Sequence, residues 1–346
     1  MIKHWKLMTT IALLCITTLI VTCLFKNLNN HENKKNLKLV FAIDIIRHGD
    51  RTPVHDLPFF SEHWKDQEKG ILTKKGEKEA FKLGQDIRKD YIKDKQLLPE
   101  QFSNHSILVK SSNKQRTVET AKQITKGIYP DLRKVNVELF NDENNPLLPK
   151  DLPLSIVTTY LKNNASSELI NEIKQTIDNI NHNLNSNFTE YDIGKISDTI
   201  TVNESHDIKK PKNLSKTNYR NAKKLGKIAR IVALSSHKVS CTAGSLLLTN
   251  ILHLLGNKPD THNPKYILYI THDAIIMGLL NLLDFPNIDP PYLARLQIEL
   301  FRDSLGKLYV KLSYNNTPIT ICSAEYCELK TFIKTTKTRL TLCSDL

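Results

Sequence analysis

The strongest constraint on the fold is an apolar run at residues 37–46 that ends directly in a polar turn, Arg47-His48-Gly49-Asp50-Arg51-Thr52-Pro53. A strand that ends in such a turn presents its last residues at the carboxyl edge of a sheet, where open α/β folds bind ligands. Guanidinium groups bind multi-oxygen anions in forked pairs, so Arg47 and Arg51 around His48 predict a phosphate held for attack by the imidazole. For an Arg-His pair taken alone, the commoner structure is a loop whose charged side chains face solvent.

Two further strands are followed by polar residues of the same kind. Residues 106–110 form the second strand candidate, and Arg116 lies in the first turn of the helix that follows. Residues 265–271 form the third candidate, and His272 and Asp273 come directly after it, before an apolar helix. Because strands that alternate with helices are typical of α/β proteins, we expect a mostly parallel sheet flanked by helices. All three junctions are then expected at one edge of that sheet.

The middle of the chain has a different texture. From residue 142 to residue 218 it is richer in Asn, Ser and Lys. Residues 168–184 have the apolar spacing of a helix, whereas residues 186–215 show little periodicity and predict a long irregular connection. We therefore expect an α-helical cap at residues 142–218, inserted into an α/β catalytic domain that consists of residues 37–141 and 219–346.

The residues at the three junctions fit phosphoryl transfer, which needs a nucleophile, positive donors on the phosphate oxygens and an acid for the departing oxygen. His48 is the candidate nucleophile and Asp273 the candidate acid. The candidate phosphate ligands are Arg47, Arg51, Arg116 and His272. Clustered arginines disfavour a protonated imidazole, so His48 is expected to stay neutral in mild acid. Taken singly, Arg116 also fits a helix surface, Asp273 a helix N-cap and His272 a hydrogen-bonded strand end.

The net charge of +13 indicates affinity for anionic substrates or surfaces. The lysines are scattered rather than gathered in a stripe, and no basic motif with interleaved aromatic residues is present, so we expect no nucleic-acid partner. No Cys or His residues have the spacing of a structural zinc site, and we expect neither a metal nor a cofactor.

The N-terminal segment, residues 1–25, is typical of an export signal. Lys3 and Lys6 precede an uncharged run at residues 7–25. The run is long for a signal-peptide core and no A-x-A-like cleavage site follows it, so a retained membrane anchor stays open as the alternative. We expect an exported protein that is periplasmic, secreted or lysosome-like, and that contacts a membrane only through this segment if it is not removed.

Four cysteines lie outside that segment, and an exported compartment permits disulfides. Four cysteines allow three pairings. Cys322 and Cys327 enclose a short loop that a disulfide could close, which makes them the better pair. Cys241 and Cys343 are then the remaining, weaker pair.

These motifs resemble those of the histidine acid phosphatases in the phosphoglycerate-mutase-like superfamily. The turn at residues 47–53 and the distant pair His272-Asp273 carry the resemblance. Further matching segments are Trp64, residues 70–76, residues 109–117, residues 269–273, Pro290-Pro291-Tyr292 and Glu299-Leu300-Phe301. The resemblance extends from residue 38 to about residue 330 and is weakest between residues 142 and 218.

The resemblance implies a large α/β domain with an inserted helical cap, and the hydrolysis of small-molecule phosphomonoesters in acid through a phosphohistidine intermediate. By position it implies His48 as the nucleophile and Asp273 as the proton donor. The implied phosphate ligands are Arg47, Arg51, Arg116 and His272. Of the cysteine pairs, only Cys322 with Cys327 resembles a pair of the family.

Two positions depart from the family pattern. Ala274 and Ile275 follow Asp273 where the family usually has Thr or Ser, and the asparagine typical of phytases is missing, which favours a general phosphatase. Arg295 stands where mammalian relatives have a disulfide cysteine. The alternatives are a phytase or another narrow phosphatase on the same fold and, from a different class, an inactive anion-binding or lipid-binding surface protein. The sequence leaves a homodimer open.

Overall fold

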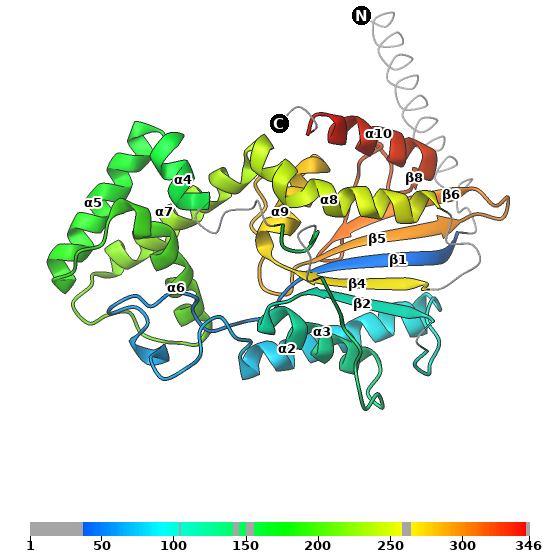
Figure 1. The fold of residues 1–346 in the computed structure, drawn as a ribbon, viewed down its shortest axis with the longest axis horizontal. Coiled ribbons are helices and arrows are strands. Elements are labelled where there is room, and N and C mark those ends of the chain that lie inside the picture. Colours follow the sequence, from blue (N-terminus) through cyan, green and yellow to red (C-terminus); the bar gives the residue numbers. More distant parts are fainter. Residues whose placement is uncertain (1–36, 104, 141–144, 150–155, 258–263, 344–346) are drawn as a thin grey trace, which may run out of the picture.

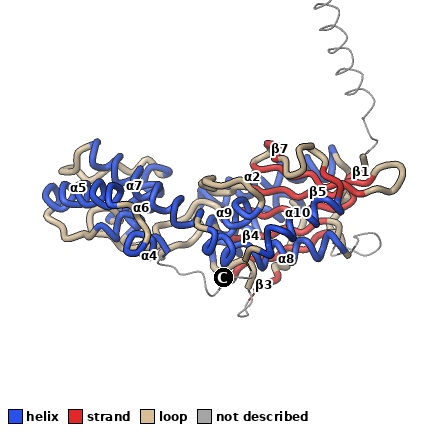
Figure 2. The backbone as a smooth tube through the Cα atoms, turned by 90° about the horizontal axis from the view of Figure 1, so that it is seen from above, coloured by secondary structure: helices blue, strands red, loops and turns tan. Residues whose placement is uncertain are grey.

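The structure is a computed structural model that describes residues 37–103, 105–140, 145–149, 156–257 and 264–343. Two lobes lie side by side, one built on a β-sheet and one made of helices (Figure 1, Figure 2). The helical lobe lies beyond the end of the sheet at which β1 (Lys38–Arg47) runs into its polar turn. Residues 1–25, with their predicted signal peptide or anchor, lie outside the described residues.

The sheet has the strand order β3-β2-β4-β1-β5-β6-β7, and β8 pairs with β6. The parallel half consists of β1 with β2 (Ile107–Ser112), β3 (Glu138–Phe140) and β4 (Tyr266–Thr271). The antiparallel half consists of β5 (Arg295–Arg302), β6 (Leu308–Tyr314), β7 (Thr317–Ile319) and β8 (Cys327–Glu328). The predicted α/β fold is confirmed, and the sheet is mixed because β5 runs antiparallel to β1 and continues into an antiparallel hairpin with β6.

Helices cover both faces of the sheet (Figure 1). Alternate residues of β1 enter two apolar cores, because successive side chains of a strand point to opposite faces. Ile43 and Ile45 pack in the core formed with α8 (His237–Gly256), α9 (Asp273–Leu282) and α10 (Leu329–Thr341). Ala42 and Ile46 pack in the core formed with α2 (Lys74–Arg88) and α3 (Gln115–Ile128). β1 is thereby buried on both faces, and its end is a fixed point for the turn that follows.

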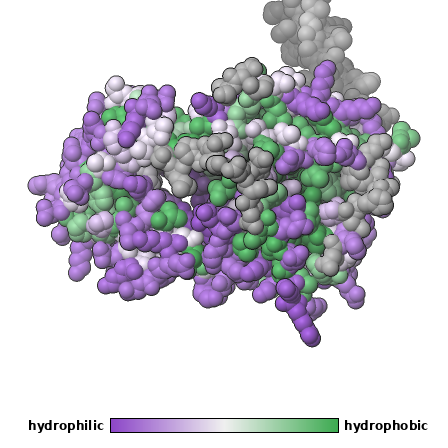
Figure 3. Space-filling model, viewed as in Figure 1, coloured by the Kyte–Doolittle hydropathy of each residue, from purple (hydrophilic) through white to green (hydrophobic). Residues whose placement is uncertain are grey.

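The helical lobe has an apolar core of its own. It contains α4 (Ile156–Asn163), α5 (Ser167–Leu184), α6 (Ile193–Ser205) and the first part of α7 (Lys216–Ser235). Short irregular helices complete the described structure, a π-helix at Lys89–Asp94 and 3-10 helices at Glu62–Trp64 and Glu190–Asp192. Hydrophilic side chains line most of the outline of both lobes on the face shown in Figure 3.

The expectation of a long irregular connection over residues 186–215 is wrong, because α6 lies within it. Ile193, Ile196 and Ile200 are fully buried at the spacing of one helix face. The helix is rich in Ile, Thr, Val and Ser, which have low intrinsic helix propensity. Packing against the lobe core stabilises it instead, as tertiary contacts do for most helices in proteins.

Arg295 forms a buried ion pair at the centre of the sheet. Its guanidinium donates to the carboxylate of Asp44 on β1, at 2.9 Å from Nε and 2.7 Å from Nη2. The hydroxyls of Tyr91 and Tyr266 donate to the same carboxylate. Arg295 therefore belongs to a satisfied polar network.

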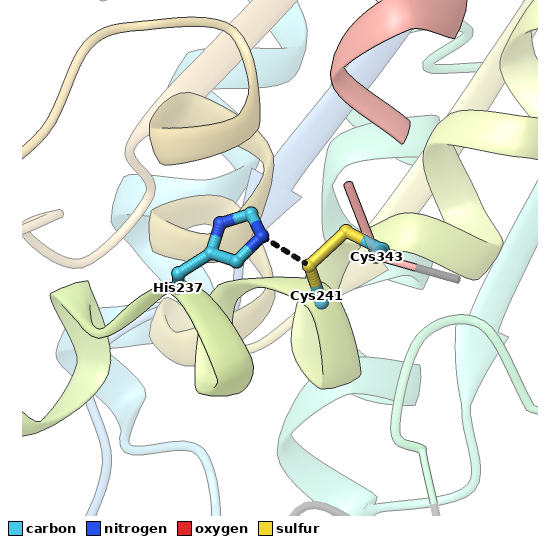
Figure 4. A group of neighbouring side chains, drawn as sticks. All are labelled: His237, Cys241 and Cys343. Atoms are coloured by element: carbon cyan, nitrogen blue, oxygen red, sulfur yellow. Dashed lines mark hydrogen bonds between the residues drawn. A yellow bond between two sulfur atoms is a disulfide. The ribbon is translucent and has the colours of Figure 1, made fainter. Parts of the chain in front are cut away.

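The cysteines in the described residues form two disulfides, Cys241–Cys343 and Cys322–Cys327. The first joins α8 to the chain end after α10, and the ring of His237 lies against its sulfur atoms (Figure 4). These three side chains are close enough to hold a metal ion, but sulfurs bonded to each other do not supply the thiolates that metals bind. The group is therefore a structural cross-link.

The closest approach between α2 and α3 occurs at two glycines. A Cβ atom at Gly84 would lie 2.1 Å from the carbonyl oxygen of Ile124, and one at Gly127 would lie 2.2 Å from that of Phe81. No side chain fits at these distances without moving a backbone. The two glycines therefore allow the backbones of α2 and α3, the helix that carries Arg116, to pack in direct contact.

Gly84→Ala is therefore expected to lower the free energy of unfolding by about 1–3 kcal/mol, the usual cost of overpacking. Gly256→Ala is the matched control, because its new methyl group would meet only Ile333 Cδ1, at 3.9 Å. Urea unfolding followed by circular dichroism measures both variants. Equal stability of Gly84→Ala and the unchanged protein would contradict the close contact.

Candidate active site

The three junctions meet at one edge of the sheet. β2, β4 and β1 are adjacent strands that run parallel, so their carboxyl ends lie side by side. Arg47 is the last residue of β1 and His48 follows it, Arg116 lies in the first turn of α3 after β2, and His272 and Asp273 follow β4. The predicted site residues, Arg47, His48, Arg51, Arg116, His272 and Asp273, all interact electrostatically within this one pocket.

His48 is buried and held in one tautomer. Its Nδ1 lies 2.9 Å from the carbonyl oxygen of Gly49, and because a carbonyl only accepts, Nδ1 carries the hydrogen. The lone pair is therefore on Nε2. Burial and the charges of Arg47 and Arg116 hold the pKa of His48 well below its usual value. The imidazole is thus neutral in mild acid, as a nucleophile must be.

Three guanidinium groups have an unsatisfied donor in this pocket. Among the described residues, the Nε atoms of Arg47, Arg51 and Arg116 are buried and have no hydrogen-bond partner. A buried donor left unsatisfied costs about 1–3 kcal/mol, and more when it is charged. Three such donors around one imidazole indicate a site built for an anion.

The terminal nitrogens of the same arginines are engaged by the protein. Arg47 donates from Nη1 to the carbonyl oxygen of Pro290 and contacts Asp273 from Nη2, and its guanidinium lies over the ring of Tyr292. Arg51 donates from Nη2 to both carboxylate oxygens of Asp198, at 2.9 and 3.2 Å. These contacts fix the direction in which each Nε–H points.

Arg116 is the least compensated of the three arginines. Its Nη1 donates to the carbonyl oxygen of Gly70 at 3.3 Å. Burial and the charge of Arg51 lower the pKa of Arg116 to about 10. The side chain is still a cation in acid, and it is one that an incoming anion would stabilise strongly.

His272 stands edge-on to His48, with 5.5 Å between the ring centroids. Nε2 of His272 lies 3.0 Å from the hydroxyl of Ser112, and Nδ1 lies 3.5 Å from Nη2 of Arg116. The arginine can only donate, so Nδ1 accepts and Nε2 carries the hydrogen. Burial and the charge of Arg116 lower the pKa of His272 to about 3. His272 is therefore neutral as well.

Asp273 begins α9 and its carboxylate faces two arginines. Oδ1 accepts from the backbone N–H of Ala274, while Oδ2 lies 3.0 Å from Arg47 Nη2 and 2.5 Å from Arg230 Nη1. Burial by itself would raise the pKa of Asp273, but the charges of Arg47 and Arg230 outweigh it and hold the pKa well below the usual range. The carboxyl group is ionised in the free protein.

A comparison with known protein families identifies the family to which these site residues belong. The model of the histidine phosphatase superfamily, branch 2, matches residues 38–315 of the chain. The chain belongs to this superfamily. The family resemblance drawn from the junction motifs is thereby confirmed.

Individual relatives of this histidine phosphatase are distant in sequence but similar over most of their length. Lysosomal acid phosphatase of Xenopus laevis is 25% identical, with 92% of this chain and 79% of the relative aligned. Prostatic acid phosphatase of Mus musculus is 24% identical, with 85% of each chain aligned. The phytase of Klebsiella sp ASR1 superimposes with a TM-score of 0.67 over 88% of this chain and 96% of the phytase, at 16% identity. That last similarity shows a shared fold.

Sequence reasoning missed two charged residues of this histidine phosphatase site. Asp198 on α6 pairs with Arg51, and Arg230 on α7 pairs with Asp273. Both come from the helical lobe and have no strand junction beside them. Burial by itself would raise the pKa of Asp198, but the charge of Arg51 outweighs it and lowers the pKa, so the residue is an anion.

Asp50 of the polar turn connects the site to the helical lobe. Its carboxylate accepts from the hydroxyls of Thr73 and Ser205 and lies 2.6 Å from Nε2 of His206. Nearby, the indole N–H of Trp64 donates to the side chain of Asn203 at 2.8 Å. The end of α6 is thus bound to the same turn that carries His48.

The two neutral, buried imidazoles predict that the free protein loses stability between pH 7 and pH 5. An unfolded histidine gains a proton near its ordinary pKa of 6.5, whereas His272 gains one only near 3, so acid favours the unfolded chain. For His272 alone the loss at pH 5 is about 2 kcal/mol. Urea unfolding of the unchanged protein and of His272→Asn at both pH values measures this, and the variant should lose about 2 kcal/mol less. An equal loss in both proteins would contradict a neutral His272.

Proposed function

We propose that this protein is an acid phosphatase that hydrolyses phosphomonoesters through a phosphohistidine formed on His48. The observation that carries the proposal is the set of three buried, unsatisfied Nε–H groups around a neutral imidazole whose lone pair is on Nε2. A phosphate group offers several oxygens to such donors and one phosphorus atom to the imidazole. Membership in the histidine phosphatase superfamily supports the same chemistry.

In the first step Nε2 of His48 attacks phosphorus, and the bond from phosphorus to the alcohol oxygen breaks. Arg47, Arg51 and Arg116 hold the phosphate oxygens. Their charges lower the pKa of His272 in the free site, and a bound phosphate offsets them, so Nδ1 of His272 can gain a proton and become a further donor. Asp273, which neighbours Arg47, gives its proton to the departing oxygen. The Nδ1–H of His48 keeps its bond to the carbonyl of Gly49, which stabilises the positive charge that the attacking ring acquires.

In the second step a water molecule attacks the phosphohistidine from the side that the alcohol has left. The ionised Asp273 now accepts a proton from this water, and the bond between phosphorus and Nε2 breaks. Inorganic phosphate leaves and His48 returns to its neutral tautomer. The step ends with a protonated Asp273, which releases its proton to solvent as phosphate leaves, because the charges of Arg47 and Arg230 again stabilise the carboxylate.

Asp273 is ionised in the free site, and the substrate changes this. Arg47 contacts Asp273 and lines the phosphate pocket, so a bound phosphate brings negative charge next to the carboxylate. Negative charge at that distance disfavours ionisation and raises the pKa of Asp273. The proposed acid therefore takes up its proton in the substrate complex, and acidic solution favours this step.

The two disulfides support a protein that works in an oxidising, exported compartment. The similarity to phytase structures concerns the fold and leaves the substrate open. A general phosphomonoesterase is the proposed activity, and a phytase on the same fold is the alternative that a substrate panel containing phytate distinguishes.

His48→Ala is expected to lower the hydrolysis of p-nitrophenyl phosphate near pH 5 by at least about four orders of magnitude. It should also abolish the labelled phosphoenzyme that an acid quench traps, because the proposed intermediate forms on Nε2 of this side chain. His253→Ala, at an exposed histidine near the end of α8, is the control and should keep full activity. Labelling that persists in His48→Ala would assign the nucleophile to another residue.

Asp273→Asn is expected to slow alkyl phosphates by about 10²–10⁴-fold, the usual contribution of a general acid. Aryl phosphates with acidic leaving groups should slow much less in the first step, because their oxygen departs without a proton. Asp284→Asn, an exposed residue just beyond α9, is the control. The measurement is the rate of phosphoenzyme formation with an alkyl and with an aryl phosphate, in the variant and in the unchanged protein. An equal decrease of this rate for both substrates would exclude Asp273 as the proton donor.

A further inference from the structure

A cleft of about 300 Å³ opens beside Arg47, between the helical lobe and the segment that follows α9. α6 and α7 form one wall, and residues 289–292 form the other. Because Arg47 belongs to the phosphate pocket, the cleft is where the alcohol part of a phosphomonoester would lie. Its lining therefore determines which leaving groups the site accepts.

Three cations on one face of α7 line this cleft. Lys223, Lys227 and Arg230 are four and three residues apart, which places them in a row along the helix. A row of cations without ion-pair partners next to a phosphate site would favour substrates that carry a second phosphate. The negative charge of that phosphate would be attracted to each cation at a separation of a few ångströms.

These cations are not free. Asp289, on the opposite wall, lies 3.1 Å from Nζ of Lys227 and also pairs with Arg230. Arg230 additionally contacts Asp273 at 2.5 Å. Lys223 pairs with Glu204. The side chain of Asp289 is only 19% exposed, so solvent screens these pairs less than it screens surface pairs.

We propose that Asp289 is a specificity-determining residue, which neutralises Lys227 and Arg230 and so favours monoesters whose leaving group carries no second phosphate. The inference rests on the proposed phosphatase function and adds its substrate class. A second phosphate would have to compete with the carboxylate of Asp289 for the same two cations, and it would face the negative charge of Asp289 as it entered. An uncharged alcohol meets neither obstacle.

The test compares two substrates that differ only in the second phosphate, propane-1,3-diol monophosphate and propane-1,3-diol bisphosphate. The unchanged enzyme should have a higher kcat/KM for the monophosphate than for the bisphosphate. The value for the bisphosphate is first divided by two, because that substrate has two reactive phosphate groups. Asp289→Asn keeps the size of the side chain, frees Lys227 from its ion pair and leaves Arg230 paired with Asp273. It should raise the ratio of kcat/KM for bisphosphate over monophosphate by about tenfold. Added salt should reduce the gain, because ions screen the freed charge.

Three further variants separate this effect from general changes. Asp284→Asn removes the same charge from an exposed site and should leave the ratio unchanged. Asp289→Glu keeps the charge and should keep the original preference. Lys227→Met removes a cation but leaves Asp289, so it should lower the ratio, which provides a test of opposite sign even if Asp289→Asn does not fold.

The ratio also cancels any effect of Arg230 on Asp273, since both substrates use the same proton donor. An unchanged ratio in Asp289→Asn and Lys227→Met, in enzymes that still hydrolyse the monophosphate, would overturn the role of Asp289 alone. A wild-type preference for the bisphosphate would overturn it too. Absence of any phosphatase turnover in the unchanged protein would overturn the proposed function instead.

Discussion

The burial of three arginines in one pocket is the constraint on which the rest of the structure depends. Like charges repel, and a buried guanidinium without a partner is costly, so each arginine has a partner that fixes the place of another element. Arg47 contacts Asp273 at the start of α9, Arg51 contacts Asp198 on α6, and Arg116 contacts the backbone at Gly70. The same charges keep His48 and His272 neutral. The arginine charges that require partners within the pocket are therefore the same charges that keep both imidazoles neutral.

The helical lobe is bound to the sheet lobe through this polar pocket. Each lobe has its own apolar cores, and the residues that join the lobes at the site are charged or hydrogen-bonded. Asp198 holds Arg51, and Asp50, two residues after the proposed nucleophile, holds the end of α6 through Ser205 and His206. A change in how α6 sits on the sheet lobe would therefore also move an arginine of the phosphate pocket. The position of Arg51 and the arrangement of the lobes are therefore coupled through the same few side chains.

The sequence predicts the strand junctions well, because each one is local. Arg47, Arg116 and His272 each stand beside an apolar run whose period identifies a strand or a helix, and parallel strands bring their carboxyl ends together. Asp198 and Arg230 have no such signal, since they reach the pocket by ion pairs from helices far along the chain. α6 itself is hidden by residues of low helix propensity, which only tertiary packing makes helical. Ser112 ends β2, and no local pattern indicates that its hydroxyl lies 3.0 Å from Nε2 of His272.

The forked shape of the guanidinium explains why arginines stand at all three positions. Each of the three gives its terminal nitrogens to protein partners, a carboxylate, a carbonyl or a histidine nitrogen, and keeps a buried Nε–H unsatisfied. The partners hold the side chain in place before any ligand arrives, so little rotational freedom is lost when an anion binds. A lysine has a single nitrogen, which cannot both be fixed by the protein in this planar way and present a second donor in a set direction. The ion pairs of the free site thus do not compete with the proposed phosphate for every donor, because they orient the donors that it would use.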